Sequence, residues 1–175
     1  MIISVETAKQ LVTFNGWTDE KIKMKLLAVE QTIRAYTNNN FQNRGIRVKA
    51  SIQNGMLTAK NALIPFAVDD TIQVSESLYN NGLYTVSGAY DDSCTINEDI
   101  RDEAVVTVTK VEYPADVVAC CVELMEWAVN YGGKVGVKSE TLSRHSVTYE
   151  DSATLFMGYP VGILNGLKLH RKARF

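Results

Sequence analysis

Residues 114–133 read PADVVACCVELMEWAVNYGG and form the most informative stretch of the chain. Pro114 suits the first position of a helix, and Gly132-Gly133 is a pair at which a helix commonly ends. Between these limits apolar residues recur at three- and four-residue spacing, at Val117, Cys121, Leu124, Met125 and Ala128. This periodicity predicts a helix from Pro114 to about Asn130 that turns one face to a core.

The chain after this helix has a polar stretch and then a short apolar segment with a basic end. We expect a glycine-rich loop over residues 132–140 and a polar strand over residues 142–149. A short helix is expected from Pro160 to Leu169, weakened by two internal glycines. A helix of this length is marginal in water by itself. It therefore needs a partner, which is either the chain's own core or another subunit with an acidic or apolar groove.

The N-terminal part of the chain predicts two further helices. The first begins after Ser4, a good N-cap residue, and runs to about Phe14. The second is capped by Thr18 and ends at the polar run of residues 37–40. Its apolar positions recur at spacings of four, three, four and three residues, at Ile22, Leu26, Val29, Ile33 and Tyr36. We expect both helices to pack against the helix that starts at Pro114.

Residues 41–112 lose the helical period and alternate as short strands separated by turn residues. The strongest turn signals are Asn54-Gly55 and Asn80-Asn81-Gly82. The expected strands cover residues 46–52, 57–66, 71–77, 83–88, 94–97 and 104–111. Short strands in this number predict a small antiparallel barrel or sandwich.

Together these patterns predict the fold class α+β. The helical part is expected to be a small bundle, with three main helices and a short C-terminal helix, built from residues 1–40 and 113–175. Residues 41–112 would form a small antiparallel β module inserted into that bundle.

Composition and charge exclude several classes of protein. Hydrophobic residues make up 46% of the chain and charged residues 22%, which is typical of a folded domain. The net charge is −2, so the chain as a whole is not an electrostatic nucleic-acid binder. The last eight residues hold four cations, and without these four positive charges the rest of the chain would carry −6. The chain is thus acidic over residues 1–167 and basic over its last eight residues. Neither a membrane helix nor a signal peptide is predicted.

The sequence shows no pattern typical of a catalytic or cofactor site. His145 and His170 have no G-x-S-x-G nucleophile motif to accompany them. Cys120 and Cys121 are neighbours on a helix and are expected to be buried, reduced thiols. The glycines after residue 131 lack phosphate-loop spacing and follow a helix rather than a strand. We therefore predict that the protein is not an enzyme and holds no cofactor or metal ion.

The order of these elements resembles the head–tail connector proteins of tailed bacteriophages, also called adaptor or head-completion proteins. The resemblance covers roughly residues 1–37 and 114–175. Three segments support it, PADVVACCVELMEW (114–127), GGKVGVKSETLSRHSVTYED (132–151) and YPVGILNGLKLHRK (159–172). The family-like positions of the middle segment are Gly136, Lys138, Ser139, Glu140, Ser143, Ser146 and Tyr149. The β module departs from shorter members of the family, and its role stays open.

The resemblance implies a structural virion protein at the head–tail junction. Such proteins form a homo-oligomeric ring, dodecameric in the virion, between the portal protein and a tail-side stopper or tail-completion protein. DNA passes through the ring without specific binding. The residues implied in portal docking are Leu167, Lys168, Leu169, Arg171, Lys172, Arg174 and Phe175. The loop implied at ring interfaces or the channel contains Gly132, Gly133, Lys134, Gly136, Lys138, Ser139 and Glu140.

Two other functions remain open from the sequence. One is a different head–tail or tail-completion ring protein, such as a stopper. The other is a nucleic-acid-binding module that uses the β region, although residues 41–112 hold few aromatic side chains flanked by basic ones.

Overall fold

The computed structural model of the chain describes residues 1–60, 65–96, 99–132, 139–142, 145–148 and 155–173. The chain divides into two compact units. The barrel unit consists of Met1 and residues 40–113, and the helical unit consists of residues 2–39 and 114–175. The chain crosses between the units after residues 1, 39 and 113.

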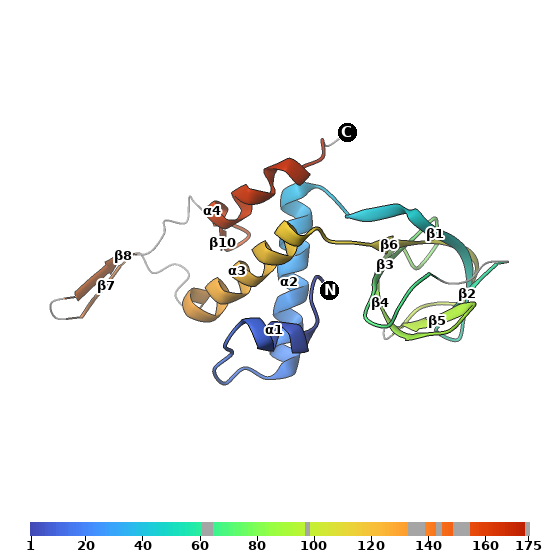
Figure 1. Cartoon of the computed structure of the whole chain (residues 1–175), viewed down its shortest axis with the longest axis horizontal. Helices are drawn as coiled ribbons and strands as arrows, with labels where there is room; N and C mark the ends of the chain where they lie inside the picture. Colours follow the sequence, from blue (N-terminus) through green and yellow to red (C-terminus); the bar gives the residue numbers. More distant parts are fainter. Residues whose placement is uncertain (61–64, 97–98, 133–138, 143–144, 149–154, 174–175) are drawn as a thin grey trace. The chain divides into compact units, whose positions relative to one another are not determined.

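The barrel unit is a closed six-stranded antiparallel β-barrel (Figure 1). Its strands are β1 (Gln42–Gln53), β2 (Met56–Ala59), β3 (Thr71–Ser75), β4 (Gly82–Ala89), β5 (Ser93–Ile96) and β6 (Glu103–Val111). Their order around the barrel is β1-β2-β5-β4-β3-β6, and β6 pairs with β1 to complete the circle. The predicted Asn54-Gly55 turn joins β1 to β2, with both residues at positive φ. Closure leaves no strand edge unpaired among these strands.

Alternating side chains of the strands fill the barrel interior. On the central strands Ile72, Val74, Val106 and Val108 are fully buried. Twelve buried residues form this core, Ala50, Ile52, Leu57, Ala59, Phe66, Ile72, Val74, Val86, Cys94, Ile96, Val106 and Val108. A barrel of this size is therefore a packed core and not a channel.

The predicted fold class, a small helical bundle with a small β module, is wrong. The β region is a closed barrel with a core of its own. Each of its six strands is hydrogen-bonded on both edges within the barrel, so the barrel needs no further sheet or helix to cover an open edge. The helical unit, in turn, has only two helices longer than two turns among its described residues, so it is less than a bundle of three main helices.

The helical unit is built on α2 (Asp19–Thr37) and α3 (Ala115–Tyr131), which pack against each other. The short helix α1 (Val5–Leu11) precedes them, and Ser4 and Thr18 are the N-caps of α1 and α2 as predicted. The predicted apolar faces are confirmed apart from Tyr36, which is only half-buried. The buried residues are Ile22, Leu26, Val29 and Ile33 of α2 and Val117, Cys121, Leu124, Met125 and Ala128 of α3. No helix in the described ranges is long and apolar enough to span a bilayer.

The C-terminal part of this unit contains four short elements. They are β9 (Leu155–Phe156), β10 (Tyr159–Pro160), the single-turn α4 (Val161–Leu164) and the 3-10 helix η3 (Asn165–His170). The predicted helix from Pro160 to Leu169 is thus a brief α turn followed by a 3-10 segment. The 3-10 period of three places Leu164 and Leu167 on one side, and both are buried.

The polar strand predicted over residues 142–149 is confirmed for residues 145–148, which form β8 (His145–Thr148). The predicted loop over residues 132–140 is wrong at its end, because Ser139 and Glu140 belong to a further strand, β7 (Ser139–Leu142). Strands β7 and β8 form a two-stranded sheet. The strands are antiparallel, with Ser139 opposite Thr148 and Leu142 opposite His145. The pairing gives one edge of each strand its backbone hydrogen bonds, which a single polar strand would lack.

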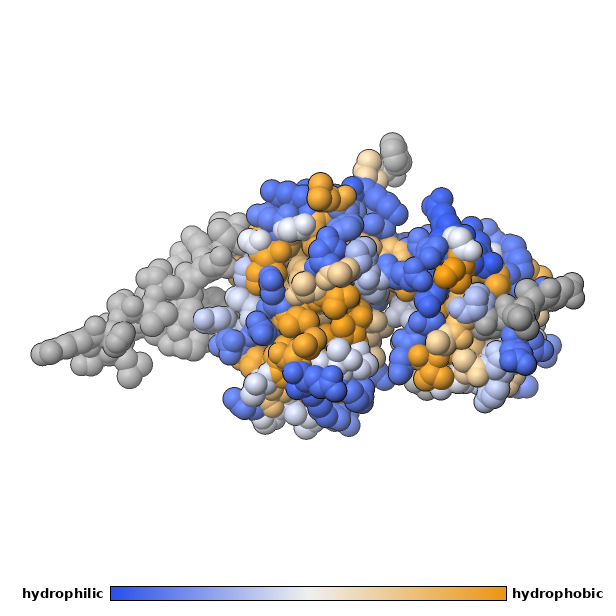
Figure 2. Space-filling view, in the orientation of Figure 1, coloured by the Kyte–Doolittle hydropathy of each residue, from blue (hydrophilic) through white to orange (hydrophobic). Residues whose placement is uncertain are grey.

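Apolar side chains remain visible on the helical unit around the crossing of α2 and α3 (Figure 2). Val118, Val122, Trp127 and Val129 of α3 are only half-buried. Apolar side chains outside the core face of a helix typically indicate that the helix packs against a second surface as well.

The loop between β3 and β4, residues 77–81, is held by a dense set of hydrogen bonds from the base of β6. Glu103 accepts hydrogen bonds from the Ser77 hydroxyl, from the Leu78 amide at 2.7 Å and from the Asn80 side chain at 2.8 Å. The Asn80 side chain also bonds the Arg101 backbone in both directions, each at 2.9 Å. The Glu103 carboxylate and the Asn80 side chain thus connect the turn to the start of β6 and to Arg101.

These hydrogen bonds predict an acid-sensitive loop. The hydrogen bond from Ser77, and next that from the Leu78 amide, hold the pKa of Glu103 below its ordinary value. A lowered folded-state pKa means that the stabilisation is present at neutral pH and is lost as pH falls through that value. A 13C NMR pH titration of the Glu103 carboxyl should give a midpoint below the usual glutamate value of about 4.3, and Ser77→Ala should raise it. A wild-type midpoint at or above the usual value would contradict this reading.

A candidate docking groove at the C-terminal segment

The end of α2 holds the C-terminal segment through its polar run. The Lys172 amide donates to the Thr37 carbonyl at 2.8 Å. Asn38, which caps α2 in the left-handed region with a φ of 49°, donates its side-chain amide to the carbonyls of Lys172 and Ala173 at 3.3 and 3.0 Å. Asn39 donates to the His170 carbonyl at 3.2 Å. These four hydrogen bonds, made by Thr37, Asn38 and Asn39, form one clamp, which we call the asparagine clamp.

Sequence reasoning predicted only a helix end at residues 37–40. The signal that could have indicated more is the run of three asparagines, since a single asparagine suffices to end a helix. Asparagine tolerates positive φ and also carries two amide donors. The structure uses both properties at Asn38, which turns the chain and binds the C-terminal backbone.

A second contact fixes the same segment to the start of α3. Nε2 of His170 lies 2.6 Å from Oδ2 of Asp116 in the first turn of α3. This hydrogen bond holds the pKa of Asp116 below its ordinary value. Together with the buried Leu164 and Leu167, it ties η3 to both long helices.

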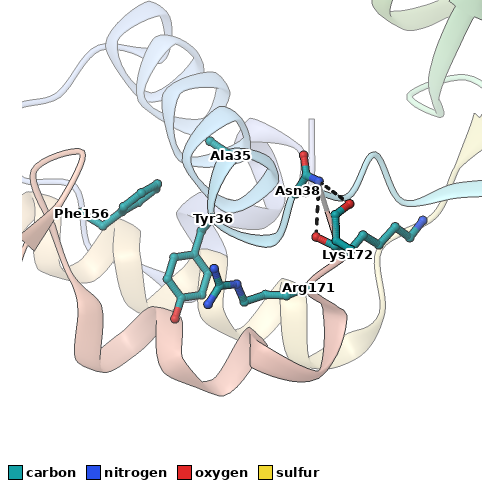
Figure 3. Close-up of a pocket in the computed structure, with 7 residues that line it drawn as sticks. Ala35, Tyr36, Asn38, Phe156, Arg171 and Lys172 are labelled. Atoms are coloured by element: carbon teal, nitrogen blue, oxygen red, sulfur yellow. Dashed lines mark hydrogen bonds between the residues drawn. The ribbon is translucent and has the colours of Figure 1, made fainter. Parts of the chain in front are cut away.

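An open groove lies beside the asparagine clamp. Its volume is about 670 Å³, and its walls are Ala35, Tyr36, Asn38, Phe156, Arg171, Lys172 and Ala173. Tyr36 forms its centre, between Phe156 and the Arg171 side chain (Figure 3). The Phe156 ring meets Tyr36 edge-on, with centroids 5.5 Å apart, and the Arg171 guanidinium lies 5.3 Å from the Tyr36 centroid.

The groove combines apolar rings with positive charge. The Tyr36 hydroxyl donates to the Asn165 side-chain oxygen at 3.1 Å, so the ring is fixed at its far end as well. Among the described residues that line the groove, two are cations and none is a carboxylate. Such a surface is suited to an apolar or aromatic side chain that arrives with negative charge beside it.

The structure separates the residues predicted to dock onto a portal. Leu167 is 1% exposed and belongs to the core of the helical unit, whereas Lys168 is exposed and Leu169 is 94% exposed. Arg171 and Lys172 line the groove. Arg174 and Phe175 lie outside the described residues. Of the two partners considered for this segment, its own core accounts for Leu164 and Leu167 but not for Leu169.

The residues predicted at ring interfaces are described only in part. Gly132 follows α3 in right-handed helical conformation, with a φ of −60°. Ser139 and Glu140 lie in β7, opposite Thr148 and Val147. Gly133, Lys134, Gly136 and Lys138 lie outside the described residues.

The cysteines show no feature of a reactive thiol. All three cysteines are buried and form no disulfide bond. Cys94 lies in the barrel, and Cys120 and Cys121 lie on α3. Burial raises the pKa of Cys94 to about 11 and those of Cys120 and Cys121 to about 12. Within the described ranges, no cluster of three or more His, Cys, Asp or Glu side chains could hold a metal ion.

No model of a known protein family matches the chain, and no curated protein matches it in sequence. The residues and their geometry therefore carry the functional argument.

The asparagine clamp predicts a defined effect of Asn38→Gly. Glycine keeps the positive φ without strain but removes both side-chain hydrogen bonds. Each hydrogen bond contributes about 1 kcal/mol, so exchange of the Lys172 amide should rise roughly five-fold or more. Hydrogen exchange followed by NMR measures this. Asn130→Gly, at an exposed position near the end of α3, should leave the Lys172 amide unchanged. Equal exchange rates in wild type and Asn38→Gly would show that the clamp does not hold the segment.

Proposed function

We propose that the chain is a head–tail connector, a structural virion protein that forms a ring between a portal protein and tail-side proteins. The ring would extend the DNA channel and complete the head for tail attachment. The observation that carries the proposal is the C-terminal segment, which is fixed at its base and yet exposes Lys168 and Leu169. This arrangement is suited to docking, because a fixed base lowers the entropy cost of binding.

The described geometry supports a projecting C-terminal anchor. Leu167 and the asparagine clamp hold the backbone as far as Ala173. After His170 the backbone is extended, with φ −68° and ψ 129° at Arg171. Residues 171–173 are exposed. The docking surface proposed for the portal consists of Lys168 and Leu169 together with Arg171, Lys172, Arg174 and Phe175.

The charge of the barrel unit is consistent with a channel protein and weighs against nucleic-acid binding. Residues 40–113 contain six basic and ten acidic side chains, a net charge of −4. Each basic contact to phosphate would add electrostatic attraction that slows the passage of DNA. A closed barrel is by itself compatible with a nucleic-acid-binding module, but such modules carry a basic surface.

The proposal predicts that exposed residues of the C-terminal segment are needed for portal binding. Native mass spectrometry of the wild-type protein mixed with the portal protein of the same phage should show a complex at micromolar concentration. The double variant Lys168→Glu, Leu169→Asp should weaken the complex at least about tenfold, which corresponds to roughly 1.4 kcal/mol. Neither change touches the core residue Leu167.

The matched control is Lys23→Glu, Met24→Asp on α2. This pair has the same chemistry, a cation followed by an exposed apolar side chain, and Met24 is 67% exposed. The control should bind portal like wild type. The absence of a wild-type complex would sink the proposed function, and equal weakening by both pairs would reject the docking surface.

A further inference from the structure

The 77–81 loop presents two large apolar side chains to solvent from a rigid base. Leu78 is 83% exposed and Tyr79 is 65% exposed. The Ser77 hydroxyl accepts from the Tyr79 and Asn80 amides at 3.2 and 2.6 Å, and the Tyr84 hydroxyl donates to the Asn80 carbonyl at 3.1 Å. The Arg101 guanidinium lies 5.3 Å from the Tyr79 ring centroid. Exposed apolar residues on a turn fixed in this way are preorganised for docking.

The loop lies at the end of the barrel opposite to the chain crossings after residues 39 and 113. The crossings are at the start of β1 and the end of β6. Because all strands are antiparallel, the β3–β4 loop is at the other end, beside the start of β6. The nine residues of β6 span about 30 Å. The loop is therefore free of the linkers and can reach a partner.

The groove beside the asparagine clamp is complementary to this loop. Its volume of about 670 Å³ lies within the range of roughly 300–1,000 Å³ that is usual for sites that enclose a bound group. Its rings, Tyr36 and Phe156, can receive an aromatic side chain edge-on. The groove contains two cations and belongs to the helical unit, whose residues carry a net charge of +2, whereas the barrel unit that bears the loop carries −4. The aromatic character of the loop and the groove, and the opposite net charges of the two units, are therefore complementary.

We propose that the 77–81 loop of one copy inserts Leu78 and Tyr79 into the groove of a second copy. This contact joins two different surfaces, so it is heterologous, and contacts of this kind generate rings when the rotation closes. The inference rests on the proposed function, because it names the contact between neighbouring copies that a connector ring needs.

Disulfide trapping between two single variants tests the contact. Leu78→Cys and Ala173→Cys, the latter with a mass tag, are mixed under mild oxidation, so that a mixed dimer can arise only between copies. Ala173 lines the groove and is exposed. The native cysteines add little background because their thiols are buried. The matched control replaces Leu78→Cys by Tyr90→Cys, which is 59% exposed in the β4–β5 turn at the other end of the barrel.

The expected result is a mixed dimer of Leu78→Cys with Ala173→Cys at a yield at least about tenfold above the Tyr90→Cys control, since docking raises the local thiol concentration. Equal yields, or no mixed dimer, would overturn the proposed contact. Portal binding without trapping would reject this contact and leave the proposed function standing. Trapping without portal binding would keep the contact and reject the proposed function.

Discussion

The pairing of β1 with β6 is the constraint on which the rest of the structure depends. Gln42 lies opposite Val111, the Glu112 amide donates to the Phe41 carbonyl at 2.9 Å, and the rings of Phe41 and Tyr113 are 5.2 Å apart. These contacts close the barrel and also bring its first and last residues together. A domain whose two ends lie close together can be inserted into another domain without disrupting the fold of that host domain. Residues 2–39 and 114–173 can thus form one helical core around the interruption.

The end of α2 has two structural tasks. Asn38 ends the helix in left-handed conformation and, with Thr37 and Asn39, binds the backbone of residues 170–173. The same contacts hold Asn38, Lys172 and Ala173 in the wall of the groove, at whose centre Tyr36 lies. Loss of the clamp would therefore affect the C-terminal segment and the groove together. The coupling explains how a short, glycine-containing segment that is marginal in water is held in a defined position.

The sequence predicted what depends on neighbouring residues. Ser4 and Thr18 cap helices, the Asn54-Gly55 turn joins two strands, and the apolar periods of α2 and α3 mark buried faces. The sequence did not predict the features that depend on contacts between residues far apart in the chain. The barrel is a separate unit because β1 pairs with β6 across about sixty residues of sequence. The asparagine clamp joins residues more than 130 positions apart. Neither leaves a local pattern, and Leu167 resembled Leu169 in sequence although only Leu167 is buried.

The central claim, that the protein completes a channel as a ring on a portal, is tested most directly by electron microscopy of the wild-type protein bound to its portal. The account predicts a closed ring of copies, twelve in number, on the tail-facing side of the portal and coaxial with its channel. Isolated copies scattered on the portal surface, or density away from the channel axis, would contradict it.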